Sequence, residues 1–460
     1  MNCKHILEQY FKTPGLLKTS IEKLLISLEM SISTRMANYK SQTRASFWLG
    51  LFIVTIYQYF IWKGFFNLEE DLSDFSNFGA KYFSLAPIAA VIVILFHEIF
   101  EYFKKDTFFS LIFANFVTLG IFAALLEMAH FKFKATLIIS FYLLTILINV
   151  LVWVVTIKLN SSLRTFVLLL VGGAIALLIS YFPNSNSLLP NLLLFHFYRL
   201  AFVFTSLDPK QVLPIENLRT ARVLAFIFSP SYLTTPLPVN FSQWRVSTDE
   251  IEKRRLKSKA AVYLTICFLF LLLMKEVKPL RAAAHKGIDI YFWKWHAFGL
   301  ANYLYFFLFS YVNITLPISL MWWCGIKLPD PYVLPLLAVT PQDRWRRWNT
   351  YFYEWFFKYI YLPVFRRSSS LIVSVLAVFG VTFILHASRY SDLWILDVET
   401  YPSIRNMTRK YLFFLAHGFL VYIGIRFSKY WPDENKASGW LGVILMMFLM
   451  SFIHGIFILI

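Results

Sequence analysis

The chain has 460 residues, of which 58% are hydrophobic, 19% aromatic and only 15% charged. A soluble chain of this length carries about a quarter charged residues and folds as several domains. The shortage of charge, together with a mean hydropathy of +0.59, excludes a soluble multidomain enzyme, a disordered chain and a fibrous repeat. The composition predicts an all-α, polytopic membrane protein.

The formal net charge of the chain is +18. In a soluble protein such a charge favours nucleic-acid binding. Here the basic residues lie between apolar runs, where the positive-inside rule accounts for most of them, so we expect no nucleic-acid partner. The three cysteines, Cys3, Cys267 and Cys324, are far apart and form no CxxC or Cys/His cluster. We therefore expect neither a disulfide framework nor a metal site.

The apolar runs predict a bundle of about eleven spanning helices, since about 20 mainly apolar residues cross a bilayer as an α-helix. In chain order these spans are 46–62, 83–100, 108–129, 136–157, 163–182, 188–206, 258–274, 297–322, 370–388, 409–426 and 439–460. Two further apolar stretches, 221–240 and 331–340, are short or rich in proline. They are predicted to be re-entrant or interfacial pieces buried in protein, because lipid cannot satisfy an irregular backbone.

Charge and spacing divide the chain into four predicted parts. Residues 1–45 are basic, which indicates a cytoplasmic N-terminus. Their helical spacing of apolar residues fits a helix on the membrane surface and a solvated leader equally well. Residues 46–182 form the N-terminal transmembrane helices, 188–390 form a core, and 409–460 form the C-terminal transmembrane helices.

The segment 343–370 is the least apolar part of the C-terminal half. Its aromatic residues recur at helical spacing and predict one helix face. This stripe consists of Trp345, Trp348, Phe352, Trp355 and Tyr359. Pro363 is expected to end the helix. On periodicity alone, an aromatic stripe beside Arg and Lys indicates an anchor at the level of the lipid headgroups.

The next segment, 370–388, is apolar apart from small hydroxyl side chains and His386. A histidine inside a spanning helix is costly unless it is paired or faces a wet cavity. A neutral imidazole can also take a proton from a hydroxyl near neutral pH. Two interpretations of His386 follow: it is a general base, or it is a histidine near a helix end whose hydrogen bonds are satisfied.

The string RWRRWNTYFYEWFFKYIYLP, followed by His386, resembles the core of the membrane-bound O-acyltransferases. In that family a WRRW-type helix carries Asn or His, and an apolar helix then brings in a His. FSPSYLTTPLPVNF at 228–241 and HFYRLAF at 196–202 are similar to two upstream family motifs. The resemblance covers 190–390. Asn349 stands where the alginate-acetylating branch usually has His, and no Pro-Leu-Gly-Gly run follows Tyr361, so the acceptor stays open.

The resemblance implies acyl transfer from a thioester donor, usually acyl-CoA, to a hydroxyl, with the thioester as co-substrate and no bound cofactor. His386 would deprotonate the acceptor, and Asn349 would orient a substrate or stabilise the oxyanion. The acceptor would be a hydroxylated lipid, an envelope saccharide or a peptide. The side chains expected to bind substrate or donor are Arg346, Arg347, Trp348, Tyr353, His196 and Arg199.

The arginines around this string suit CoA phosphates, because a guanidinium matches phosphate geometry. Positive-inside anchoring explains any one of them as well. These arginines are Arg344, Arg346, Arg347, Arg366 and Arg367. His417 and His454 lie inside late spans, where we interpret them as buried polar contacts between helices.

A transporter or lipid flippase is the alternative function, with His386, His417 and Arg199 marking a translocation path. The acyltransferase-like string favours the enzyme. Either function places the chain in a membrane as a multi-pass protein: the plasma (inner) membrane of a bacterium, or the endoplasmic reticulum of a eukaryote.

Overall fold

The structure is a computed structural model. It describes residues 98–99, 135–156, 158–181, 201, 239, 243–247, 249–286, 292–386, 404–431 and 439–459. This part of the chain is 84% helical, as the composition predicts. The predicted leader 1–45, the spans 46–62 and 108–129, and most of 83–100, 188–206 and 221–240 lie outside the described residues.

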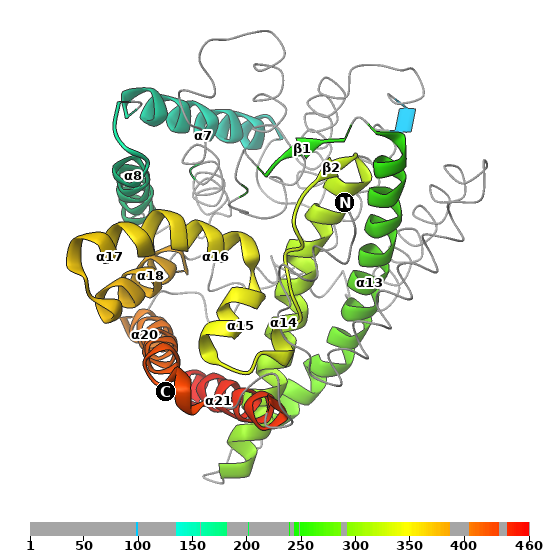
Figure 1. Ribbon diagram of the computed structural model, residues 1–460, viewed down its shortest axis with the longest axis vertical. Helices are drawn as coiled ribbons and strands as arrows, with labels where there is room; N and C mark the ends of the chain where they lie inside the picture. Colours follow the sequence, from blue (N-terminus) through cyan, green and yellow to red (C-terminus); the bar gives the residue numbers. More distant parts are fainter. Residues whose placement is uncertain are drawn as a thin grey trace.

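Helices occupy each predicted span that falls within the described residues (Figure 1). They are α7 (Ala135–Val155), α8 (Ser161–Tyr181), α13 (Glu250–Lys286), α14 (Phe292–Trp323), α18 (Leu371–His386), α20 (Ile404–Arg426) and α21 (Gly439–Leu459). Within this part of the chain, one stretch, His296–Trp323 of α14, is long and apolar enough to cross a membrane. Shorter apolar stretches lie in α7, α8, α18, α20 and α21.

Helix α13 is longer than the predicted span 258–274 because polar residues extend it at both ends. At its start the Asp249 side chain accepts a hydrogen bond from the Ile251 amide at 3.0 Å, which caps the helix. Glu252 in its first turn pairs with Lys327. A carboxylate at this position also interacts favourably with the helix dipole.

A short antiparallel pair, β1 (Arg245–Val246) with β2 (Ile326–Lys327), is the one sheet in the described residues. Gly325 makes the turn from α14 into β2 with a φ of 75°, a conformation that glycine adopts without strain. The pair holds the start of α13 beside the end of α14 (Figure 1).

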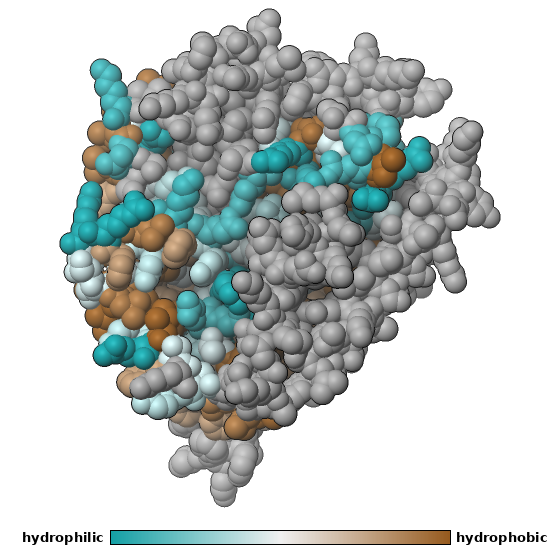
Figure 2. Space-filling view, in the orientation of Figure 1, coloured by the Kyte–Doolittle hydropathy of each residue, from teal (hydrophilic) through white to brown (hydrophobic). Residues whose placement is uncertain are grey.

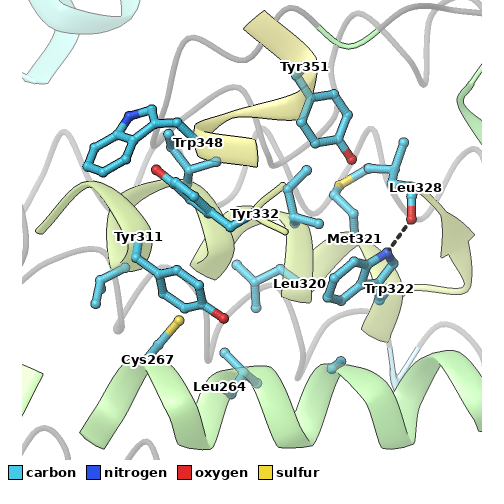
Figure 3. Close-up of a cluster of buried hydrophobic side chains, with 14 of the residues drawn as sticks. Leu264, Cys267, Tyr311, Leu320, Met321, Trp322, Leu328, Tyr332, Trp348 and Tyr351 are labelled. Atoms are coloured by element: carbon cyan, nitrogen blue, oxygen red, sulfur yellow. Dashed lines mark hydrogen bonds between the residues drawn. The ribbon is translucent and has the colours of Figure 1, made fainter. Parts of the chain in front are cut away.

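The main apolar core lies between α13 and α14. Figure 3 shows Leu264 and Cys267 of α13 close to Tyr311 of α14, with Trp322 further along the same core. The Trp322 indole N–H donates to the Leu328 carbonyl at 2.9 Å, so its polar atom is satisfied inside the core. This packing holds α14 as the central helix of the described part.

The expected single helix after residue 343 is interrupted, so that prediction is wrong. The chain instead forms a series of short pieces. These are α15 (Pro341–Trp348), α16 (Thr350–Phe356), the π-helical η4 (Phe357–Tyr361) and α17 (Leu362–Ser368). Asn349 is extended, with φ −155° and ψ 97°. Pro363 does not end the run; it lies in the first turn of α17, where a proline is tolerated.

The interruption also splits the aromatic stripe. Trp348 packs in the core of α13 and α14, whereas Trp355 and Tyr359 pack against Leu168 of α8 in a separate cluster. All three side chains are buried. The interpretation of the stripe as a headgroup-level anchor is therefore wrong for these residues, which fill two protein cores.

Apolar side chains gather on the edge of the molecule formed by α17, α18 and α20, beside hydrophilic ones (Figure 2). Phe365, Val373 and Phe419 are among the exposed apolar residues of these helices. More exposed leucines lie on α7, α8 and α21, such as Leu151 and Leu441. Exposed apolar surface of this extent marks an interaction with lipid or with another protein.

Helices α14 and α21 approach closely at Gly299. A Cβ atom built there would lie 1.8 Å from the Ser451 carbonyl oxygen. Because this atom belongs to a helix backbone, it cannot swing aside as a side chain would. Glycine is thus required at this crossing for steric reasons.

We expect Gly299→Ala to lower the thermal midpoint of the purified protein, since overpacking costs about 1–3 kcal/mol. Gly380→Ala is the matched control, because Gly380 is also helical and has no atom within 4 Å of an added Cβ. Alanine there should be neutral or stabilising by about 0.5–1 kcal/mol. Equal midpoints for the two variants would contradict the close crossing.

Candidate functional site

Asn349, the predicted orienting residue, lies between α15 and α16 and is 6% exposed. Its Oδ1 accepts a hydrogen bond from the Phe352 amide at 3.2 Å, which makes Asn349 the N-cap of α16. This bond identifies the other side-chain atom as the amide nitrogen. Among the described residues, Nδ2 has no hydrogen-bond partner, so it remains an available donor on a buried residue.

The loop before α15 holds this break in place. The Thr350 amide donates to the Pro331 carbonyl, and the Val333 amide donates to the Arg347 carbonyl, both at 3.0 Å. The Tyr351 hydroxyl donates to the Pro329 carbonyl at 2.6 Å. The predicted piece 331–340 is mostly irregular, with one short 3₁₀ turn, η3 (Pro335–Leu337). Its backbone therefore packs beside Asn349 and helps to fix its conformation.

His386 is the last residue of α18. Helix α18 packs against η4, α17 and α20, so the helix that carries His386 lies beside the segment that follows Asn349 (Figure 1). The side chain of His386 is outside the described part of the structure. The meeting of His386 and Asn349 in one cavity stays a prediction.

Two of the arginines predicted to bind substrate or donor share one carboxylate. Arg346 Nη2 lies 2.6 Å from Asp343 Oδ1, and Arg347 Nε lies 2.6 Å from Asp343 Oδ2. Arg347 is buried, whereas about half of the Arg346 side chain is exposed. Of this pair, only Arg346 presents accessible surface to a solute.

The other predicted site residues differ in their surroundings. Trp348 is buried and stacks on Phe306 of α14, with ring centroids 5.6 Å apart. Tyr353 is half-buried and stacks on Phe357. Burial raises the pKa of Tyr353, and the charge of Arg346 partly offsets this. His196 and Arg199 lie outside the described residues.

Sequence reasoning did not group Arg344 with His417 and His454. The structure buries all three side chains, which are at most 5% exposed. Both histidines are thus buried in the helical bundle, as predicted. The only sequence feature that pointed to this group was the presence of two histidines inside late apolar runs. Their proximity to Arg344 follows from tertiary packing alone.

A search of protein-family models and of curated proteins finds no match to the chain. Within the described residues, no group of three or more His, Cys, Asp or Glu side chains can hold a metal ion. The site must therefore be interpreted from its own geometry and from the motifs of this sequence.

Glu354 lies on α16, a helix too short to span a bilayer. It accepts a hydrogen bond from the Gln243 side-chain amide. Burial raises the pKa of the Glu354 carboxyl, while this hydrogen bond and Lys358 oppose the shift. The folded protein therefore holds the Glu354 proton more tightly than the unfolded chain does. As pH rises from the ordinary pKa to the raised one, this group makes folding less favourable.

We expect Glu354→Gln to remove this loss of folding stability at higher pH, since glutamine keeps a hydrogen-bonding group without the charge. The measurement is the thermal midpoint of the variant minus that of the wild type. This difference should increase as pH rises above about 4, where a glutamate ordinarily titrates, and should then level off. Glu250→Gln at the exposed start of α13 controls for loss of a carboxylate. A Glu354→Gln difference that does not change with pH would rule out this coupling.

Proposed function

We propose that the chain is a membrane-bound O-acyltransferase that moves an acyl group from a thioester, such as acyl-CoA, to a hydroxyl of a lipid or envelope saccharide. The single observation that carries the proposal is the geometry of Asn349. This residue interrupts the helix within the family-like string, is buried, and keeps an amide donor without a partner among the described residues.

In the proposed reaction, His386 takes the proton of the acceptor hydroxyl. The acceptor oxygen attacks the thioester carbonyl, a C–O bond forms, and the C–S bond breaks. The proton then passes from the imidazolium to the departing thiolate. Asn349 Nδ2 donates to the oxygen on which negative charge develops. The backbone on either side of Asn349, at Arg347 and Thr350, is hydrogen-bonded to the preceding loop, which supports a donor aligned before the reaction begins.

The proposal includes a multi-pass helical bundle in a lipid bilayer. The apolar stretch His296–Trp323 and the exposed apolar side chains of the shorter helices support it. The chain would lie in the plasma (inner) membrane of a bacterium or in the endoplasmic reticulum of a eukaryote. Arg346 would meet phosphates of the donor, because its side chain is the more exposed of the Asp343-bound pair.

One observation favours the second candidate, a transporter or lipid flippase. Arg344, His417 and His454 are buried among helices, and intramembrane ionisable groups commonly mark transport paths. The family-like string has no evident purpose in a transporter. Acyl transfer is therefore the first proposal.

His386→Ala should abolish most turnover while retaining helix content and thermal midpoint. Loss of a positioned base lowers rates by about a hundred- to ten-thousand-fold. Turnover is measured by mass spectrometry of new acyl esters on lipid and glycan acceptors incubated with acyl-CoA. Esterification at the wild-type rate by this variant would refute the assignment of the base.

Asn349→Asp and Asn349→Ser separate the two roles of this side chain. Each replacement can still cap α16, but neither carries the amide N–H. We expect near-wild-type stability and a fall in turnover of about a hundred- to a thousand-fold, typical of a lost oxyanion donor.

Thr340→Ala is the matched control, because Thr340 caps the neighbouring α15 through its bond to the Asp343 amide. It should lower stability by about 1 kcal/mol and leave turnover per folded molecule unchanged. If Asn349→Ser is as active as the wild type, Asn349 serves only as a cap.

A further inference from the structure

Four helices, α14, α15, α20 and α21, meet around a buried polar group (Figure 1). We name it the arginine–histidine cluster; it consists of Tyr303, Arg344, His417 and His454. These side chains are 1%, 3%, 2% and 5% exposed, respectively. Such burial of polar groups within an apolar bundle requires partners to offset their desolvation.

The members of the cluster are neighbours. The Tyr303 and His454 rings have centroids 5.3 Å apart, and the His454 and His417 rings 6.1 Å apart. The His417 ring lies 5.6 Å from that of Trp345, and Arg344 Cζ lies 5.8 Å from the same Trp345 ring. The four side chains thus form one contiguous group inside the bundle.

Arg344 is only partly satisfied. Its Nε donates to the Tyr303 hydroxyl at 2.9 Å, and its guanidinium lies 4.3 Å over the Trp348 ring. Within the described residues, no carboxylate pairs with Arg344, and its two Nη groups make no hydrogen bond. Because Asp343 already binds Arg346 and Arg347, no described carboxylate is left to compensate the charge of Arg344. A buried charge without a partner costs several kcal/mol.

The histidines add hydrogen-bonding groups of a defined kind. His417 Nδ1 lies 2.8 Å from the Phe413 carbonyl oxygen. Since a carbonyl can only accept, Nδ1 carries the proton, and Nε2 of the neutral ring is an acceptor. His454 makes no hydrogen bond to any described residue. The site therefore offers guanidinium donors beside at least one imidazole acceptor.

We propose that the arginine–histidine cluster binds the phosphate group of a ligand. A guanidinium fork matches phosphate oxygens. A phosphate monoester has three terminal oxygens, enough for groups arriving from separate helices, and its second pKa of about 6 leaves a fraction protonated to donate to His417 Nε2. A carboxylate has two oxygens and, when ionised, no proton to donate. On sequence alone Arg344 is one of several arginines that suit CoA phosphates; the site proposed here takes a phosphate whether or not the chain transfers acyl groups.

The phosphate can belong to a soluble molecule or to a lipid headgroup, and two experiments distinguish these sources. In the first, detergent-purified full-length protein is titrated with inorganic phosphate by calorimetry, with sulfate as the comparison. In the second, native mass spectrometry measures retention of phosphatidic acid by protein from nanodiscs of phosphatidylcholine with or without that lipid. Binding in the first experiment indicates a soluble ligand, and binding in the second alone indicates a headgroup.

Arg344→Gln is measured in whichever of the two experiments detects binding to the wild type. We expect it to weaken that binding by at least about tenfold, because a charged hydrogen-bond donor is lost. Arg344→Lys keeps the charge but loses the fork, so it should bind more weakly than the wild type even if Arg344→Gln fails to fold. Arg426→Gln is the matched control, an exposed arginine on α20, the helix that also carries His417; it should bind as the wild type does.

Sulfate should bind more weakly than phosphate, because it carries no proton for His417 near neutral pH. Absence of binding in both experiments would overturn the proposal. So would unchanged affinity in Arg344→Lys, or equal affinity for sulfate and phosphate. None of these measurements depends on ester formation, so the failure of one proposal does not imply the failure of the other.

Discussion

The break in the helical path at Asn349 positions most of what surrounds the candidate site. Backbone hydrogen bonds from residues 331–333 hold it on one side, and the Asn349 side chain caps the next helix on the other. Since these bonds replace those that a continuous helix would make, the chain can change direction inside the protein without leaving amides unsatisfied. Helix α15, before the break, packs against α20, while η4 and α17, after it, lie against α18.

Charge is distributed unevenly along the short helix before that break. Asp343 binds two of the three arginines, and the third is turned toward aromatic rings and histidines. The same eight-residue helix therefore carries a compensated ion-pair group and a cation that no carboxylate in the described part of the chain compensates. An electrostatic asymmetry of this kind is costly to maintain, which suggests that it serves binding rather than folding.

The long apolar helices were predictable because each is defined by a continuous local pattern. Helices α7, α14 and α21 begin and end within a few residues of the apolar runs that predict them. The break at Asn349 was not predictable in this way. Aromatic residues continue at helical spacing across it, and the loop carbonyls and amides that stabilise it act through tertiary contact.

The candidate site, too, was predictable from the sequence only where a local pattern marks it. Asn349 and His386 were found by resemblance of short motifs, and the structure adds the conformation of the first. The convergence of Arg344 with His417 and His454 depends on how four helices pack. No spacing along the chain reports this convergence, because the residues are separated by whole helices.

The π-helical segment η4 has a geometric consequence for everything that follows it. A π turn accommodates about one more residue than an α turn, and each α-helical residue rotates the chain by about 100°. The side chains of α17 therefore face directions that a regular helix starting at Thr350 would not give them. Loss or gain of one residue within Phe357–Tyr361 would rotate α17 relative to α16 as a rigid cylinder. Such an insertion or deletion would redirect Arg366 and Arg367 without altering either residue.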